Sequence, residues 1–330
     1  MEEFVKLAKE EITPFNEAFI DMVTNGQEKK AAASAQSYTR DRLRENSFTE
    51  KILTPIDISN DELDKASDPE LLVKWNEREP DSDGAPAISV PLRTVPDGLQ
   101  FKGRRYPSYF SRIMSPMFSQ DVDALRGYGY DIRQALLDIS TKDIATEIDT
   151  LFMNAVKSSI GAVDGVNTVN AANPLNGLSL PQWVSISGGL TKENLIEGFK
   201  VMQRLKVPFS PMQPDGSESK GIMLMNTTTG MDLLKMDRSE VGGDKAEEQY
   251  VSGVPVLTPL GVKAIFTIKR DLIPDGTVYL FSSEEFFGKY YRLQPLTCYM
   301  KNEMFFLRFA QYMNISLSIG NVKGAVRLDF

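Results

Sequence analysis

The chain has 330 residues, of which 42% are hydrophobic and 25% charged, a balance typical of globular proteins that can bury a sizeable core. Its formal net charge of −8 argues against a protein that grips nucleic acid through a concentrated basic surface. The absence of histidine excludes Ser-His-Asp, Cys-His and histidine-based zinc sites, and the single Cys298 excludes an intrachain disulfide and favours a reducing compartment.

Residues 1–56 are predicted to form an N-terminal arm. The segments 4–11 and 15–23 carry apolar side chains at helical spacing, and an alanine-rich stretch follows from Lys29 to about Leu43. Their apolar content is too low for an independent core. We therefore expect the arm to be ordered mainly by packing on neighbours, the alternative being an ordinary helical cap.

Residues 57–92 are predicted to form a polar hairpin. Ten acidic and three basic residues lie between Asp57 and Asp83. Two short runs, Leu71–Trp75 and Ala87–Val90, indicate strands, and the segment between them is dense in turn-forming residues. Because the hairpin has too few core residues to be a domain, we interpret it as a projecting arm; an ordinary surface hairpin is the alternative.

Residues 93–160 are predicted to contain a basic extended segment followed by a long helix. The segment 98–118 combines aromatic residues with four cations and no acid, a composition also found in single-strand nucleic-acid platforms. The acidic total of the chain instead favours an extended strand that faces an acidic neighbour. From Tyr130 to Ser159 apolar residues recur at steps of three, four and five with charged residues between them, which predicts an amphipathic helix.

Residues 161–290 are predicted to form a compact α/β domain. After a glycine-rich loop, Thr191 caps a helix whose apolar face includes Leu195 and Phe199. Strands and helices then alternate, as in a small α/β unit. Short apolar runs that predict strands lie at 221–226, 250–257, 262–268 and 278–281.

The most regular pattern lies between Phe305 and Ile319. Alternate residues there are apolar, with a single break at Gln311, which predicts one long half-buried strand. At about 3.3 Å per residue it spans roughly 50 Å, comparable to the predicted helix, so the two can bury a continuous seam. The residues expected in this seam are Leu136, Ile148, Leu151, Phe152, Phe305, Leu307, Phe309, Ile315 and Leu317.

The order of these parts resembles the major capsid protein of tailed bacteriophages, which has the Hong Kong 97-type fold. Local similarities are the strand Ile222–Asn226 with its Asn-initiated helix, the Gly-Val-Pro-Val turn Gly253–Val256, and Lys323–Gly324 after the long strand. The resemblance implies an α+β fold made of the following parts: an N-terminal arm (1–56), an extended loop (57–92), a peripheral domain with a spine helix (93–160), an axial α/β domain (161–290) and return strands of the peripheral domain (291–330).

The resemblance also implies a function. It implies a structural protein, not an enzyme, that assembles as hexamers and pentamers into an icosahedral or prolate shell enclosing phage DNA. The shell would assemble in the cytoplasm of the host bacterium and form the capsid of the virion. We expect no scaffold domain fused to the chain, and hence a separate scaffold protein. The other expected partners are a portal and possibly decoration proteins. Double-stranded DNA is expected near the inner face without sequence-specific binding, and no membrane is expected.

Two alternatives stay open at this point. One is an encapsulin-like compartment with the same fold, and the other is a histidine-free cytosolic enzyme that uses carboxylates or lysine. The chain has no phosphate-binding Gly-rich motif and no EF-hand spacing, so we predict no catalytic, cofactor or metal site.

The charge pattern predicts a contact between subunits, because an acidic arm repels itself and gains from an external counter-charge; a solvated acidic surface is the alternative. Some capsid proteins of this type form a Lys-to-Asn cross-link from the hairpin tip. The tip here, 77–87, has no lysine, so we expect no cross-link. The residues expected at the interface are Asp64, Glu70, Lys74, Trp75, Glu77 and Glu79 on the arm, and Arg93, Lys102, Arg104, Arg105 and Arg112 opposite them.

Overall fold

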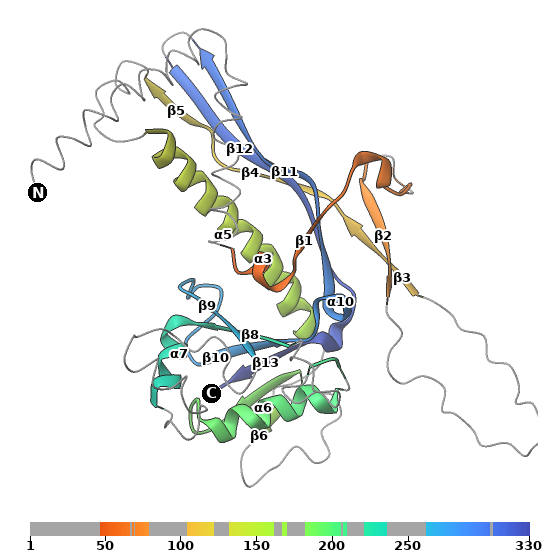
Figure 1. Ribbon diagram of the computed structural model, residues 1–330, viewed down its shortest axis with the longest axis vertical. Helices are drawn as coiled ribbons and strands as arrows, with labels where there is room; N and C mark the ends of the chain where they lie inside the picture. Colours follow the sequence, from red (N-terminus) through yellow and green to blue (C-terminus); the bar gives the residue numbers. More distant parts are fainter. Residues whose placement is uncertain are drawn as a thin grey trace, which may run out of the picture.

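The chain consists of an elongated part, a compact part and a two-stranded ribbon that leaves the elongated part (Figure 1). The C-terminus lies in the compact part. The computed structural model describes residues 47–66, 68, 70–78, 104–121, 132–161, 167–169, 182–205, 207–209, 221–235, 262–303 and 306–330.

The elongated part is built on a five-stranded sheet with two long antiparallel strands at its centre. β11 (Gly288–Glu303) pairs with β12 (Phe306–Ile319) from Gly288 opposite Ile319 to Glu303 opposite Phe306. The long strand predicted from the alternating pattern is confirmed as β12. Three short strands complete the sheet: β1 (Pro55–Asp57) beside β11, and β4 (Ser111–Met114) and β5 (Phe118–Asp121), which both pair with β12.

The predicted long helix is α5 (Ile132–Gly161), which is 30 residues long and lies along one face of this sheet (Figure 1). Ile148 and Phe152 on its apolar stripe are buried in one cluster with Met313 and Ile315 of β12. Burial of a large apolar side chain contributes about 1.5–3 kcal/mol. The contact between α5 and β12 is therefore a main source of stability in the elongated part.

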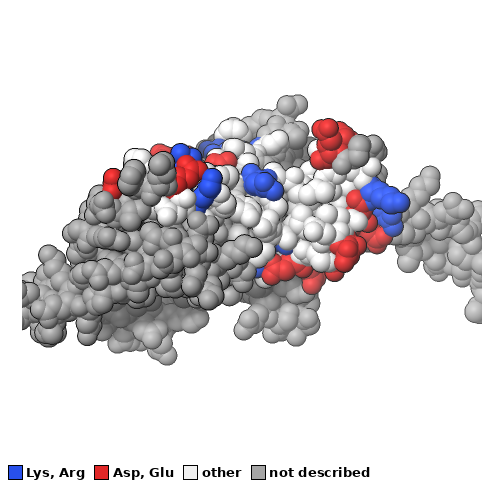
Figure 2. Space-filling model, turned by 90° about the horizontal axis from the view of Figure 1, so that it is seen from above, with Lys and Arg blue, Asp and Glu red and all other residues white. Residues whose placement is uncertain are grey.

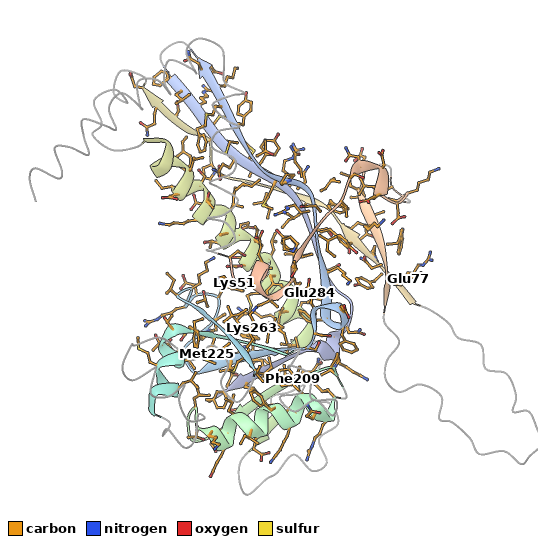
Figure 3. The ribbon with its side chains drawn as sticks, in the orientation of Figure 1. Lys51, Glu77, Phe209, Met225, Lys263 and Glu284 are labelled. Atoms are coloured by element: carbon orange, nitrogen blue, oxygen red, sulfur yellow. The ribbon has the colours of Figure 1, made fainter. Side chains whose placement is uncertain are left out.

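The end of the expected N-terminal arm also belongs to this core. Phe48 and the short helix α3 (Thr49–Ile52) pack in the same buried cluster as α5. The backbone N–H and Oγ1 of Thr54 then donate to Glu284 at 2.7 and 3.0 Å, and Figure 3 shows Glu284 close to α3. The expectation that the arm is ordered mainly by packing on neighbours is therefore wrong for residues 47–56. Residues 1–46 lie outside the described residues.

The compact part is a six-stranded sheet with α6 (Lys192–Arg204) packed against it. The predicted cap of α6 is confirmed, because Thr191 Oγ1 accepts a hydrogen bond from the N–H of Asn194. A second buried cluster, which includes the labelled Phe209 and Met225 of Figure 3, fills this part. Its strands, in order across the sheet, are β6 (Asn167–Val169), β7 (Trp183–Ile186), β13 (Ala325–Asp329), β10 (Thr277–Phe281), β8 (Ile222–Asn226) and β9 (Lys263–Thr267).

Short helices connect these elements. Asn226 begins α7, where its Oδ1 accepts from the N–H of Thr229 at 2.7 Å, as expected for an asparagine at a helix start. Besides α3, the short helices of the described chain are α7 (Thr227–Met231), α10 (Glu284–Phe287) and the 3₁₀ turns η1 (Asn60–Glu62), η2 (Asp232–Lys235) and η4 (Val322–Gly324).

The C-terminal strand corrects the expected division of the chain. Residues 291–330 were assigned as a whole to the peripheral sheet, but β13 lies between β7 and β10 in the other sheet. The turn at η4 redirects the chain after β12. Val326 and Leu328 then point into the second buried cluster, and this burial holds the strand there.

The ribbon corrects the expected hairpin. β2 (Val73–Arg78) pairs with β3 (Arg104–Tyr109), with Val73 opposite Tyr109, and not with Ala87–Val90, which lies outside the described residues. Turn-forming residues indicate where a chain can reverse but not which later strand pairs with the first. The predicted projecting arm thus has its base in two strands that are 25 residues apart in the sequence.

Candidate assembly surfaces

The α5–β12 seam contains most of the residues predicted for it. Ile148, Phe152 and Ile315 are buried in its cluster, with Leu317 packed against them. Leu307 and Phe309 are buried farther along β12. Phe305 and the side chain of Leu136 lie outside the described residues.

Leu151 is the exception, because its side chain is 37% exposed. A helical residue is rotated by about 100° from the next one, since 3.6 residues make a turn. Leu151 therefore faces away from the sheet while the adjacent Phe152 is buried, and it shares its stripe with Asp143 and Glu147. Its predicted place in the seam is wrong.

Gln311, the single break in the alternating pattern, is fully buried on the side of β12 that faces α5. Its side-chain Oε1 accepts a hydrogen bond from Thr141 Oγ1 at 3.3 Å, and its backbone N–H donates to Ser115 Oγ at 2.9 Å. A small polar cluster thus interrupts the apolar seam. The sequence shows the break but not the hydroxyl of Thr141, which satisfies the buried Oε1 while the Nε2 of Gln311 has no hydrogen-bond partner among the described residues.

Asp149 joins three separate segments, and sequence reasoning missed it by placing it among the polar residues of the helix. Its side chain is 0% exposed. Its Oδ1 accepts hydrogen bonds from Ser47 Oγ at 2.8 Å and from Thr49 Oγ1 at 2.7 Å, and its Oδ2 accepts one from Lys269 Nζ at 2.6 Å. The carboxylate therefore ties the chain before α3, and the loop after β9, to α5.

The base of the ribbon is anchored on the opposite face of the long strands from α5. Ser108 Oγ lies 2.5 Å from Ser318 Oγ, and Tyr291 Oη donates to Asn76 Oδ1 at 2.5 Å. Burial and, to a lesser degree, the nearby Tyr291 raise the pKa of Tyr106 to about 12, so its hydroxyl stays neutral. The odd-numbered side chains of β12 face α5 and the even-numbered Ser318 faces β3, as strand alternation requires.

The predicted interface charges have partners within the same chain. Arg105 and Glu77 form an ion pair at 3.0 Å, with side chains 67% and 79% exposed. Arg112 Nε donates to Asn314 Oδ1 at 3.1 Å, and its guanidinium lies over the ring of Tyr312. Arg105 of β3 is thus the partner of Glu77 of β2 within one ribbon, a kind of pairing that the sequence-based expectation placed between two subunits.

The other predicted interface residues lie along the ribbon or outside the described chain. Glu70 is exposed, and Trp75 is half-exposed at 42%, with its backbone N–H donating to Asp64 Oδ2 at 2.8 Å. Figure 2 shows acidic side chains gathered at the end of the molecule that carries η1 and the ribbon, beside a largely uncharged area. Outside the described residues are Glu79, Arg93, Lys102 and the side chain of Arg104.

A groove separates α5 from β4 and has a volume of about 670 Å³. Ile113 and Ile144 are buried at its floor, while Asp143, Glu147 and Leu151 line it from the exposed side of α5. The full lining is Ser111, Arg112, Ile113, Met114, Ser115, Pro116, Asp143, Ile144, Glu147 and Leu151.

No family model and no curated protein matches the sequence. Solved structures do match it. The capsid of cyanophage P-SCSP1u aligns with a TM-score of 0.55 and 12% identity over 86% of this chain and 88% of that chain. The mature capsid of bacteriophage PhiM1 aligns with a TM-score of 0.53 and 10% identity over 86% and 87%. The virus-like particle from Pyrococcus furiosus aligns with a TM-score of 0.50 and 14% identity over 90% and 98%.

The chain has the Hong Kong 97-type capsid fold. We propose that α5 corresponds to the spine helix of this fold, the sheet around β11 and β12 to its peripheral part, the six-stranded sheet to its axial part, and the ribbon to the base of its extended loop. Among the residues that the structure describes, no group of three or more acidic or cysteine side chains could hold a metal ion. Within the same residues, no helix is long and apolar enough to cross a membrane.

Lys74 is the lysine of the ribbon, and its ammonium group is engaged within the subunit. Its Nζ donates to the carbonyl oxygen of Glu62 at 2.6 Å and lies 3.9 Å from Asp64 Oδ2. We expect Lys74→Ala to leave the mobility of assembled protein on a denaturing gel unchanged, because we expect no covalent link between subunits at this lysine. A ladder of SDS-resistant oligomers in wild-type particles that disappears in the variant would contradict this.

Proposed function

We propose that this chain is the major capsid protein of a tailed bacteriophage, and that it assembles into an icosahedral or prolate shell around phage DNA. The observation that carries the proposal is the shared architecture: a spine helix packed on two long strands, an axial sheet and a projecting ribbon, matched by phage capsids over most of the chain. Its role would then be structural and not catalytic, and its place the virion.

Exposed apolar side chains support a protein that is covered by copies of itself. Trp75 and Tyr109 are 42% and 54% exposed on the ribbon, and Met114 is 51% exposed on β4. At the far end of the long strands, Tyr299 and Phe306 are 43% and 49% exposed. Large apolar groups grouped on exposed surface mark interaction sites. Their positions at the ends of an extended subunit fit a tile with several neighbours, in hexamers and pentamers.

The acidic charge of the chain bears on its other partners. A net charge of −8 suits a shell that encloses DNA without gripping it by sequence. The proposal includes a separate scaffold protein and a portal as partners during assembly, because closed shells with one special vertex need both a size control and an entry point.

Negative-stain electron microscopy tests the proposal directly. We expect the protein, expressed with or without the scaffold protein of the same virus, to form closed particles of uniform size. A protein that stays a monodisperse monomer at high concentration in several buffers, with and without the scaffold, would contradict a shell function and favour the enzyme alternative.

A protein compartment of the encapsulin type is the alternative within the same fold, and the phage capsids among the matched structures do not favour it. The two candidates differ in content. Phage heads from a packaging host contain nuclease-protected double-stranded DNA of defined length, whereas a compartment contains protein cargo. The ratio of absorbance at 260 and 280 nm, followed by a gel of the contents, separates them.

A further inference from the structure

The elongated and compact parts of the subunit (Figure 1) meet through an apolar contact. Phe152 and Val156 of α5 lie in one buried cluster with Tyr279 of β10 and Ala325 of β13, so the second half of α5 packs on the six-stranded sheet. Hydrophobic burial depends on the area removed from water and has no direction of its own. This contact therefore brings the two parts together but does not by itself select one angle between them.

Lys269 adds a directed contact at this boundary. It lies in the loop that follows β9, in the compact part, and its Nζ donates to Asp149 Oδ2 at 2.6 Å and to the carbonyl oxygen of Ala145 at 3.2 Å. The same ammonium group lies 5.8 Å from the centroid of the Phe48 ring. Hydrogen bonds between charged groups are short and depend on geometry. One side chain of the compact part is thus fixed against both α5 and the segment before α3.

The start of α3 closes the contact from the other side. Asp149 Oδ1 accepts hydrogen bonds from Ser47 Oγ at 2.8 Å and from the N–H and Oγ1 of Thr49 at 3.1 and 2.7 Å. The side chain of Asp149 is 0% exposed and that of Lys269 is 19% exposed. A buried ion pair adds little net stability compared with apolar side chains of the same volume, because the cost of removing two charges from water offsets their attraction. What it can supply is one defined arrangement of the elements that it joins.

Other charged contacts of the molecule lie within one part. Arg270, next to Lys269 in the same loop, pairs with Asp275 of that loop. Arg292 of β11 pairs with Asp57 of β1 in the elongated part. Among the ion pairs between residues that the structure describes, that of Asp149 and Lys269 is the one that crosses the boundary.

We propose that Asp149 and Lys269, closed by Ser47 and Thr49, form a joint that fixes the angle between the elongated and the compact part of the subunit. The joint also has a consequence for assembly, and this consequence rests on the proposed function. Head-to-tail contacts between identical copies close only when every copy presents the same rotation to the next. A subunit whose two parts keep one angle therefore forms shells of one size, whereas a subunit with a loose joint forms particles of several sizes.

Distances between two spin labels report the angle in the unassembled subunit. We place one label on α6, at Lys200→Cys, and one near the end of β11, at Lys301→Cys, because these side chains are 54% and 50% exposed. The native Cys298 is buried, and a protein without the two new cysteines controls for its labelling. With the joint intact, we expect double electron–electron resonance to give one narrow distance distribution.

Two joint variants are compared in this labelled protein. Lys269→Met removes the charged link to the compact part and leaves Asp149 its donors in Ser47 and Thr49. Asp149→Leu with Lys269→Met removes the pair without leaving a buried charge unpaired, so it is expected to retain more of the unfolding midpoint than Asp149→Ala. In both we expect the distribution to become at least about twofold broader, because the hinge between the two parts is no longer restrained. A distribution in Lys269→Met as narrow as that of the wild type would overturn the joint.

Arg270→Met is the matched control. It removes the same charge from the neighbouring position, but the side chain of Arg270 is 64% exposed and its partner Asp275 lies in the same loop. We expect the distribution to stay narrow in this variant. Equal broadening in Arg270→Met and Lys269→Met would show that the loop as a whole sets the width, and it would overturn the assignment to Lys269.

Electron microscopy of particles tests the consequence for assembly. We expect Lys269→Met to lower the fraction of particles with the wild-type diameter by about fivefold or more, since a small loss of free-energy preference shifts a population by such a factor. Arg270→Met is expected to leave that fraction unchanged. Particles of uniform size from Lys269→Met would overturn the link between the joint and the shell size. A wild-type protein that forms no particles would contradict the proposed function, and the label distances then still decide whether the joint exists.

Discussion

Replacing Asp149 with alanine is expected to lower the free energy of unfolding of the subunit by about 3–5 kcal/mol, because it removes one partner of a buried ion pair. The carboxylate is 0% exposed and lies 2.6 Å from Lys269 Nζ. The change also leaves the donors of Ser47 and Thr49 without their acceptor. Guanidinium-induced unfolding of the unassembled subunit, followed by circular dichroism, measures the loss.

Two companion variants make this prediction specific. Glu147→Ala removes an exposed carboxylate two residues away on the same helix and is expected to change the free energy of unfolding by less than about 0.5 kcal/mol. Lys269→Met removes the cation but leaves Asp149 its hydroxyl and N–H donors, so we expect an intermediate loss of about 1.5–3 kcal/mol. An Asp149→Ala protein as stable as Glu147→Ala would show that the buried junction does not hold the two parts of the subunit together.

Phe152→Ala is the second large effect that we expect, with a loss of about 3–5 kcal/mol, since the ring sits at the centre of the main core. Its centroid lies 6.3 Å from that of Phe48, 5.6 Å from Phe281 and 6.2 Å from Phe287. These rings come from the N-terminal segment, the axial sheet and α10, so one cavity would loosen three elements. Soluble yield and the denaturation midpoint measure the outcome. Phe309→Ala, at a buried position of β12, is expected to behave in the same way.

The adjacent Leu151→Ala is the matched control. Because Leu151 is 37% exposed and lines the groove, its truncation is expected to cost at most about 1 kcal/mol of unfolding free energy. Its effect should instead appear in particle yield. If Leu151→Ala destabilised the isolated subunit as much as Phe152→Ala, the orientation of α5 on the sheet would be contradicted.

Long periodic patterns account for the parts of this fold that the sequence predicted. The helix over 130–159 and the strand over 305–319 are confirmed as α5 and β12, because each pattern runs for many turns or residues and tolerates single exceptions such as Gln311. The caps at Thr191 and Asn226 are confirmed as well, since a side-chain acceptor at a helix start depends only on neighbouring residues. The order of these local elements was sufficient to indicate the capsid fold.

Only the tertiary structure decided which elements meet. The partner of β2, the sheet that contains β13 and the burial of Asp149 depend on residues that are 26 to 120 positions apart in the sequence. Periodicity shows that one face of a helix or strand is buried, but it does not show which residues pack on that face. In the sequence Asp149 therefore looks like any other polar helix residue, and Leu151 looks like any other core leucine. The groove beside α5 has the same origin. Its floor and walls come from β4 and α5, and no local pattern in either segment shows that Asp143 and Glu147 line one hollow with Ile113.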